Sequence, residues 1–142
     1  VAIATNQSGI SRGLFDMVTL NAIHDKMYRA LNTLGGRIDA IFYCPHSPED
    51  ACTCRKPLPG LIEQVADRFG IDVKDVPFVG DSLRDMQAAA AAGCAPHLVL
   101  TGKSQALRGA SLPPTFPAGT QMHTDLHAFV DALLKKTPEH AL

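Results

Sequence analysis

The sequence predicts an α/β domain with a Rossmann-like, mostly parallel sheet and helices on both faces of that sheet. Short apolar segments rich in β-branched residues alternate with longer segments whose apolar residues recur at helical spacing. Clusters of small polar or charged residues follow several of the short segments, as expected where parallel strands end. Glycine or proline lies at the ends of the helical segments, where it favours a change of direction.

The first half of the chain supplies two strands and two helices. The first strand is apolar and runs into a small polar turn, and the second has the sequence Ile-Asp-Ala-Ile-Phe-Tyr. Gly35 and Gly36 end the first helix, whereas the second helix has Pro59 near its first turn and Gly70 beyond its end. The apolar face of the first helix comprises Met17, Leu20, Ile23, Met27 and Leu31. The predicted elements are a strand over 1–4, a helix over 15–34, a strand over 38–43 and a helix over 59–69.

The second half continues the alternation of strands and helices. A Gly-Asp-Ser turn carries the chain from a strand into an alanine-rich helix that Gly93 closes. One glycine and three prolines indicate a loop over 104–117, and the tail from Thr137 is expected to fray. The predicted elements are strands over 76–79, 96–100 and 121–124, and helices over 83–92 and 126–136.

Composition limits the range of functions. The chain has 142 residues, of which 46% are hydrophobic and 19% charged, so it suits a single globular domain over 1–142. The net charge of −1 gives no reason to expect nucleic acid or an anionic membrane as a partner, and no apolar run is long enough to span a bilayer. The cysteine pattern fits a reducing compartment, so we expect a cytoplasmic monomer. Because the chain opens with Val1 inside an apolar strand, we expect that an N-terminal part is missing.

A cysteine- and histidine-containing loop follows the second predicted strand. Cys44, His46, Cys52 and Cys54 have the spacing C-x-H-x5-C-x-C, and two prolines stiffen the segment between them. Zinc in structural sites takes four thiolate or imidazole ligands in a tetrahedron, with no open position. The alternatives are free thiols or disulfides. The spacing favours a structural zinc site that fixes the position of the residues behind it.

Two groups of polar residues are placed to bind an anion. Arg55 and Lys56 follow Cys54 directly, where a forked guanidinium and a compact ammonium group can grip a phosphate. Thr5 and Asn6 follow the first strand and offer a hydroxyl and an amide. The alternatives are a solvated cation pair on a surface loop and ordinary turn or helix capping. We expect all four residues to bind a phosphorylated substrate.

Two carboxylates follow the strand over 76–79. Asp81 at the strand end suits magnesium, which takes a few carboxylates together with substrate oxygens. Asp85 lies on the same side of the following helical turn, but it also completes a Ser-x-x-acid capping pattern with Ser82, so its role stays open between metal or catalysis and capping. Residues 101–103, Thr-Gly-Lys, follow the next strand. The carboxyl ends of parallel strands meet at one edge, so these groups are expected to form one site for an anion and a cation.

Taken together, these residues resemble the haloacid-dehalogenase-like phosphatase superfamily. Thr5 matches its second motif, Lys56 its third, and Gly80-Asp81 with Asp85 its fourth. Within it, three features are similar to those of phosphatases of heptose bisphosphates. They are the predicted zinc-binding loop over 44–54 joined to Arg-Lys-Pro, the Pro59-Gly60 pair and the segment 101–103. Histidinol-phosphate phosphatases share the zinc loop and are the alternative. The resemblance covers the chain from its start to about Lys103.

The resemblance implies a magnesium-dependent phosphoric monoester hydrolase that removes the C7 phosphate of a small phosphorylated sugar, a heptose 1,7-bisphosphate, through an aspartyl-phosphate. Asp81 would hold magnesium, and Thr5, Asn6 and Lys56 would bind the transferring group. Arg55 would meet the second phosphate. The catalytic set implied for this chain is Thr5, Lys56 and Asp85.

One departure from the superfamily pattern bears on catalysis. The superfamily's nucleophile belongs to an Asp-x-Asp-Gly-Thr motif on a central first strand, and this chain contains no Asp-x-Asp. We therefore expect the sheet to lack that strand, between the strand ending at Thr5 and the one ending at Val79. We also expect the chain by itself to be inactive as a phosphatase. The alternative is a non-catalytic, zinc-stabilised binding domain.

Overall fold

The computed structural model describes residues 1–136, and the tail predicted to fray from Thr137 lies outside them. The chain divides into two compact units, Val1–Ile71 and Asp72–Leu142, and the prediction of a single domain stays a prediction. The first unit contains β1 (Ala2–Asn6), α1 (Met17–Asn32), β2 (Ala40–Cys44) and α2 (Gly60–Phe69). The second contains β3 (Pro77–Gly80), α3 (Leu83–Ala92), β4 (Ala95–Val99), a 3₁₀ helix η1 (Gly102–Leu107), β5 (Gln121–His123) and α4 (Leu126–Lys136).

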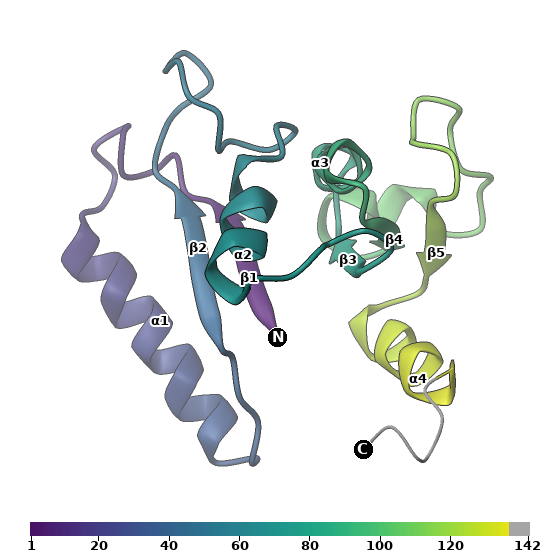
Figure 1. The fold of residues 1–142 in the computed structure, drawn as a ribbon, viewed down its shortest axis with the longest axis horizontal. Helices are drawn as coiled ribbons and strands as arrows, with labels where there is room; N and C mark the ends of the chain where they lie inside the picture. Colours follow the sequence, from purple (N-terminus) through teal and green to yellow (C-terminus); the bar gives the residue numbers. More distant parts are fainter. Residues whose placement is uncertain (137–142) are drawn as a thin grey trace. The chain divides into compact units, whose positions relative to one another are not determined.

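The first unit is built on a two-stranded parallel sheet. β1 and β2 lie side by side, and Figure 1 shows α1 and α2 on opposite sides of the pair. The register places Asn6, the last residue of β1, opposite Cys44, the last residue of β2. The backbone N–H of Gln7 extends this pairing by donating to the Cys44 carbonyl at 2.7 Å. The register therefore brings the polar end of β1 and the start of the cysteine loop to the same end of the sheet.

Each helix of this unit begins and ends for a local reason. Asp16 caps α1 by accepting a hydrogen bond from the Thr19 N–H at 2.9 Å, and Leu20 is its one buried residue. Gly70 ends α2 in the left-handed conformation at φ 61°. The predicted apolar face of α1 is wrong at one position, because Ile23 is 54% exposed whereas the neighbouring His24 is half-buried. The face that α1 buries is therefore set by the three- and four-residue spacing of the helix, which selects His24 over the more hydrophobic Ile23.

The second unit is built on a parallel sheet of order β3-β4-β5. α3 packs against β3 and β4, and α4 packs against β4 and β5. The core of this unit contains Met86, Leu98 and Leu100, with half-buried Phe78 and Leu107 among the side chains that cover them. The all-parallel pairing in both units confirms the predicted α/β class.

The strands of residues 1–136 form two separate sheets. Within residues 1–136, β1 pairs only with β2 and β3 pairs only with β4. The predicted loop over 104–117 is wrong in its first part, because residues 102–107 form η1 and Leu107 packs into the core. Among the described residues, no helix combines the length and the apolarity that a bilayer crossing requires.

Candidate functional site

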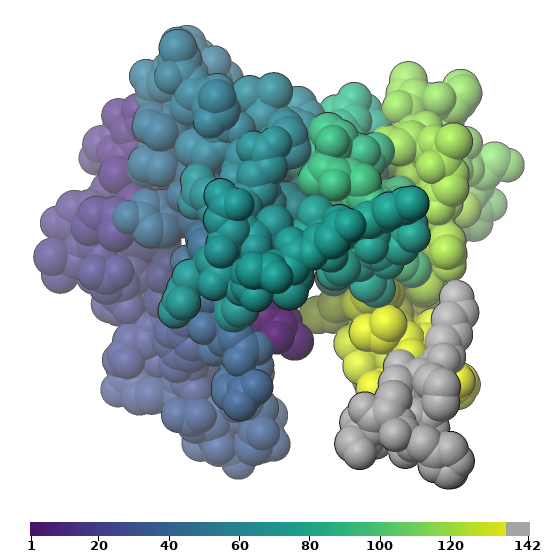
Figure 2. All heavy atoms as spheres, viewed as in Figure 1, coloured from purple at the N-terminus to yellow at the C-terminus, as the bar shows by residue number. Residues whose placement is uncertain are grey.

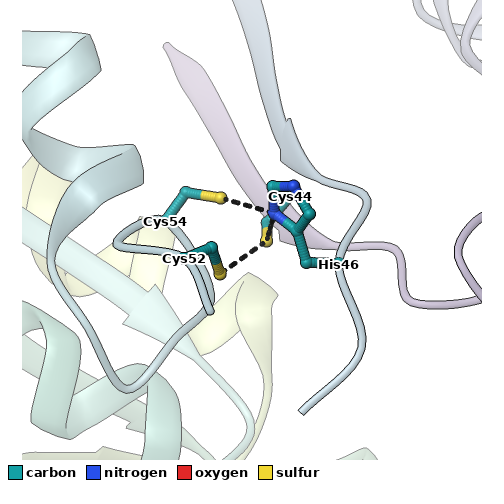
Figure 3. A group of neighbouring side chains, drawn as sticks. All are labelled: Cys44, His46, Cys52 and Cys54. Carbon is teal, nitrogen blue, oxygen red and sulfur yellow. Dashed lines mark hydrogen bonds between the residues drawn. The ribbon is translucent and has the colours of Figure 1, made fainter. Parts of the chain in front are cut away.

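The four predicted metal ligands of the first unit converge on one point. Figure 3 shows the side chains of Cys44, His46, Cys52 and Cys54 directed toward one another. Their three sulfurs and one histidine nitrogen all lie within 4.8 Å of one another. His46 Nδ1 is 3.4 Å from both Cys44 Sγ and Cys54 Sγ, and the Cys44 and Cys52 sulfurs are 3.8 Å apart. The spacing read from the sequence therefore produces a group that could hold a metal ion.

The fold builds this group from a strand end and a returning loop. Cys44 is completely buried at the end of β2 and forms a core cluster with Cys54 and Leu61 of α2. Gly60 closes the loop by donating to the Thr53 carbonyl at 3.1 Å. A Cβ at Gly60 would overlap that carbonyl, so the close approach requires glycine. The outermost part of the loop, residues 48–51, is exposed at the surface of the unit (Figure 2, blue atoms at the top).

Two of the thiols have shifted acidities. Hydrogen bonding from the backbone N–H of Arg55, the largest contribution, lowers the pKa of Cys52 to about 7. Burial, followed by the neighbouring Cys44 thiol, raises the pKa of Cys54 to about 12. The loop thus favours the thiolate form of Cys52 and, without a bound cation, the protonated form of Cys54. A bound divalent cation would reverse the preference of Cys54, because it stabilises every thiolate that ligates it.

Lys56 is hydrogen-bonded to β1 through its backbone and through its side chain. Its backbone N–H donates to Asn6 Oδ1 at 3.0 Å, and its carbonyl accepts from Asn6 Nδ2 at 3.2 Å. Its ammonium group donates to the Ala4 carbonyl at 2.9 Å. These contacts join residues about fifty positions apart, so the loop carrying Lys56 is tied to the end of the sheet.

The other two predicted substrate ligands of this unit also lie near the loop and the strand end. Thr5 is half-buried next to Asn6, and its hydroxyl accepts from Gln7 Nε2 at 3.1 Å. Arg55 donates one N–H, at Nη1, to the His46 carbonyl at 3.4 Å. A guanidinium has five N–H donors, so this contact leaves most of its fork for other acceptors.

In the second unit, Asp81 is held by three separate contacts. Its carboxylate oxygen Oδ2 accepts from the Lys103 N–H at 3.0 Å, and its carbonyl accepts from Ser104 Oγ at 2.7 Å. Its own N–H donates to Asp85 Oδ2 at 3.2 Å. Gly102 has φ +54°, and a Cβ there would overlap Asp81 Oδ2. The predicted meeting of Asp81 with residues 101–103 is therefore present in the structure.

Asp85 completes the capping box that its sequence pattern allows. Its Oδ2 atom accepts from the Ser82 N–H at 3.2 Å and from Ser82 Oγ at 2.9 Å, in addition to the Asp81 N–H. The Asp85 N–H donates back to Ser82 Oγ at 3.3 Å. The carboxylate is buried, and a Cβ at Gly80 would lie 2.5 Å from Asp85 Cβ. The geometry supports the capping alternative for Asp85 and adds a structural link to Asp81.

Sequence reasoning placed the site residues in two groups, and each group is assembled within its unit. Thr5, Asn6, Arg55 and Lys56 gather beside the cysteine loop, whereas Asp81 gathers with Asp85 and the segment 101–103. The prediction that both groups form one site stays a prediction.

Sequence reasoning missed two residues that support these groups. Asp50 accepts from Ser11 Oγ at 2.6 Å and from the Ser47 N–H at 2.8 Å, and the Ser11 contact is the main cause of its lowered pKa. The Ser-Pro-Glu-Asp sequence at 47–50 is a turn signal that could have indicated this contact. Ser104, which holds the Asp81 carbonyl, stands in a segment that carried no comparable signal.

The sequence matches known proteins over nearly its whole length. A profile of the HAD-hydrolase-like family matches residues 53–127. The chain is 57% identical over 136 residues to a D-glycero-beta-D-manno-heptose-1,7-bisphosphate 7-phosphatase of Bordetella bronchiseptica, covering 96% of this chain and 74% of that protein. It is 45% identical over 135 residues to the protein of the same name from Pseudomonas aeruginosa, covering 95% of this chain and 74% of that protein.

Solved structures agree with the sequence matches. A crystal structure of the D,D-heptose 1,7-bisphosphate phosphatase from B. bronchiseptica, complexed with magnesium and phosphate, matches with a TM-score of 0.89 and 56% identity over 96% of this chain and 75% of that one. A putative HAD-like phosphatase from Mesorhizobium loti matches with a TM-score of 0.74 and 30% identity over 94% of this chain and 64% of that one. The chain therefore belongs to the haloacid-dehalogenase-like hydrolases, in the family of D-glycero-beta-D-manno-heptose-1,7-bisphosphate 7-phosphatases.

Proposed function

We propose that this chain supplies the phosphate-binding and metal-binding part of a phosphatase that removes the C7 phosphate from a heptose 1,7-bisphosphate. The observation that carries the proposal is Lys56, which stands directly behind the cysteine loop and is tied to β1 by its backbone and its ammonium group. A fixed cation at a strand end suits a phosphoryl group better than a mobile surface lysine does. The names and the bound phosphate of the similar proteins support the same substrate class.

In this proposal, the residues of the first unit divide the two phosphates between them. Lys56 and the Thr5 hydroxyl bind the transferring phosphoryl group, whose equatorial oxygens carry charge in the transition state. Arg55 binds the anomeric phosphate with the part of its fork that His46 leaves available. Arg55 would then contribute binding energy remote from the reacting phosphorus, and Lys56 would act on the reacting group itself.

We also propose that Asp81 holds magnesium. The Asp81 Oδ2 atom accepts a hydrogen bond from the Lys103 N–H. Within residues 1–136 Asp81 Oδ1 accepts no hydrogen bond, so this oxygen suits a hard cation. When bound, magnesium neutralises phosphoryl charge. The similar B. bronchiseptica structure was obtained with magnesium and phosphate. In this arrangement Asp85, which caps α3 and orients the Asp81 backbone, is a positioning residue rather than a proton donor.

The donor set of the cysteine loop fits zinc. A tetrahedron with metal–sulfur distances of about 2.3 Å and a metal–nitrogen distance of about 2.0 Å has S–S edges of about 3.8 Å and S–N edges of about 3.5 Å. Three of the six separations match these edges, with 3.8 Å between Cys44 and Cys52 and 3.4 Å from His46 to Cys44 and to Cys54, and all four ligand atoms lie within 4.8 Å of one another. All four positions are filled by protein, so we propose a structural zinc that fixes Arg55 and Lys56.

The partner in this proposal is a small phosphorylated sugar, and the location is the cytoplasm. All four cysteines are unpaired thiols, as expected in a reducing compartment. The expected monomeric state stays a prediction.

Turnover of heptose bisphosphate tests the proposed function. Residues 1–142 alone should release no phosphate above background at saturating magnesium, because they contain no Asp-x-Asp nucleophile. The same chain joined to a segment that carries Asp-x-Asp-Gly-Thr should release phosphate from heptose 1,7-bisphosphate faster than from histidinol phosphate. Preference for histidinol phosphate would reassign the substrate. Absence of turnover in the joined protein would instead favour a zinc-stabilised binding domain.

The contact between Gly102 and Asp81 gives a sharp test of the magnesium proposal. Gly102→Ala places a Cβ on the Asp81 carboxylate and should weaken magnesium binding at least about tenfold, since each 1.4 kcal/mol is a factor of ten. Gly109→Ala is the matched control, because Gly109 has a similar φ of +74° but open space around its Cβ. The measurement is a magnesium titration of the phosphatase activity of the joined protein. Equal losses in the two variants would mean that backbone strain alone is responsible, and would remove Gly102 from the metal site.

A further inference from the structure

Asn6 uses both polar ends of its side chain on the backbone of a single residue. Oδ1 accepts the Lys56 N–H at 3.0 Å, and Nδ2 donates to the Lys56 carbonyl at 3.2 Å. This pairing resembles the hydrogen-bonded pair of an antiparallel sheet, in which two opposite residues exchange two N–H···O bonds. Sequence reasoning expected the Asn6 amide to bind substrate phosphate, whereas its amide groups are directed to the protein.

The side chain of Lys56 returns to the same strand. Its ammonium group donates to the carbonyl of Ala4, which lies two residues before Asn6 on β1. Both attachments therefore lie within three consecutive residues of β1. β1 thus fixes both the backbone and the ammonium group of Lys56.

The segment that carries Lys56 is also held to β1 by packing, because Cys54 and Leu61 belong to a core cluster that packs against Ala4. The Gly60 N–H and the Thr53 carbonyl close the loop on itself at 3.1 Å, and Leu58 donates to the Arg55 carbonyl at 2.9 Å. These two hydrogen bonds shape the loop itself. The Asn6 amide adds a polar attachment to β1 directly at the residue whose ammonium group is proposed to bind the phosphoryl group.

We propose that Asn6 is a positioning residue for Lys56. This inference rests on the proposed function of Lys56. The asparagine amide offers one acceptor and one donor at this position, whereas aspartate has no donor for the Lys56 carbonyl, and alanine has neither group. A displacement of about 1 Å at a group that stabilises a transition state can lower the rate by about a hundredfold. Loss of the Asn6 amide therefore acts on turnover through Lys56.

A double-mutant cycle on kcat tests this coupling in the joined, zinc-loaded enzyme. Asn6→Ala should lower kcat by about ten- to a hundredfold with a small change in KM. In a Lys56→Met background the same substitution should lower kcat less than threefold, because the group that it positions is gone. Additive losses would overturn the proposal and make Asn6 a direct substrate ligand. Asn21→Ala, an exposed asparagine of α1, is the control for a generic amide deletion.

Amide hydrogen exchange tests the contact in residues 1–142 without any turnover. Asn6→Ala should speed exchange of the Lys56 N–H at least tenfold while the amides of Gly60 and Leu58 keep their rates. Asn6→Asp, which keeps the acceptor and loses the donor, should leave the Lys56 N–H protected and still lower kcat in the joined enzyme. It also serves if Asn6→Ala does not fold. Unchanged Lys56 exchange in Asn6→Ala overturns the proposal even if the enzyme is an active phosphatase, and failure of the wild type to turn over overturns the proposed function alone.

Discussion

Loss of the metal from the cysteine loop is expected to unfold the Val1–Ile71 unit. Structural zinc binds with an apparent free energy of about 10–16 kcal/mol at neutral pH, which is comparable to the whole stability of a small domain at about 5–15 kcal/mol. The Cys52→Ser, Cys54→Ser double variant should therefore lose its zinc and lower the Tm by more than about 15 °C. The measurements are elemental analysis, with about one zinc per chain expected in the wild type, and thermal unfolding.

Cys94→Ala is the control for this prediction, because Cys94 is a buried thiol of the other unit and is not one of the four residues of the cluster. It should keep one zinc per chain, with only the modest loss of Tm expected from a small cavity. Retention of zinc in the double variant would contradict the assignment of the ligands.

The same site should make the unit sensitive to acid. Burial raises the pKa of Cys54 to about 12 without metal, so zinc must displace a proton from that thiol at pH 7. Metal-bound thiolates have a pKa far below that of the thiols in the unfolded chain, so the metal-derived stability is present at neutral pH and is lost as the pH falls. Zinc release measured with a chromogenic chelator during acid titration should coincide with unfolding of the unit. Unfolding that precedes zinc release would mean that another group controls the acid limit.

Lys56→Ala and Arg55→Ala are expected to separate chemistry from substrate selection. Removing a preorganised donor to a developing charge costs about 10²–10³ in kcat, so Lys56→Ala should impair hydrolysis of both the bisphosphate and a small monophosphate. Arg55→Ala removes a charged contact to the remote phosphate, worth about 1.5–3 kcal/mol. It should lower kcat/KM for the bisphosphate by about ten- to a hundredfold and leave the monophosphate nearly unchanged.

The measurement is a pair of kcat/KM values for each variant of the joined enzyme. Arg29→Ala is the matched control, because Arg29 is an exposed arginine of α1 paired with Asp25. Equal losses on both substrates in Arg55→Ala would leave Arg55 as a structural partner of the His46 carbonyl and remove it from substrate selection.

Features with a local physical cause were predictable from the sequence. The bounds of α3 match the predicted helix over 83–92, because the Ser82 cap and the Gly93 terminator act within a few residues. The metal group was predictable for a similar reason, since its four ligands fall within one eleven-residue loop that must fold back on itself.

Features that depend on orientation were not predictable. Asn6 carries the same amide whether it faces a phosphate or a backbone, and only the fold places Lys56, fifty residues later, against it. Asp85 fitted a cap and a catalytic carboxylate equally well, and the three donors around its Oδ2 atom, which support the cap, come together only in the folded chain. η1 was missed because a 3₁₀ turn has weak local preferences and depends here on the packing of Leu107.

The anchored loop has an evolutionary consequence. Pro48, Glu49, Ala51 and Thr53 are exposed between ligands whose positions are fixed by the cluster and by the core of the unit. Substitutions at these positions should be tolerated, because the side chains lie outside the cluster and outside the core of the unit. The surface of this loop can therefore change during evolution while the four ligands and the core residues behind them stay the same.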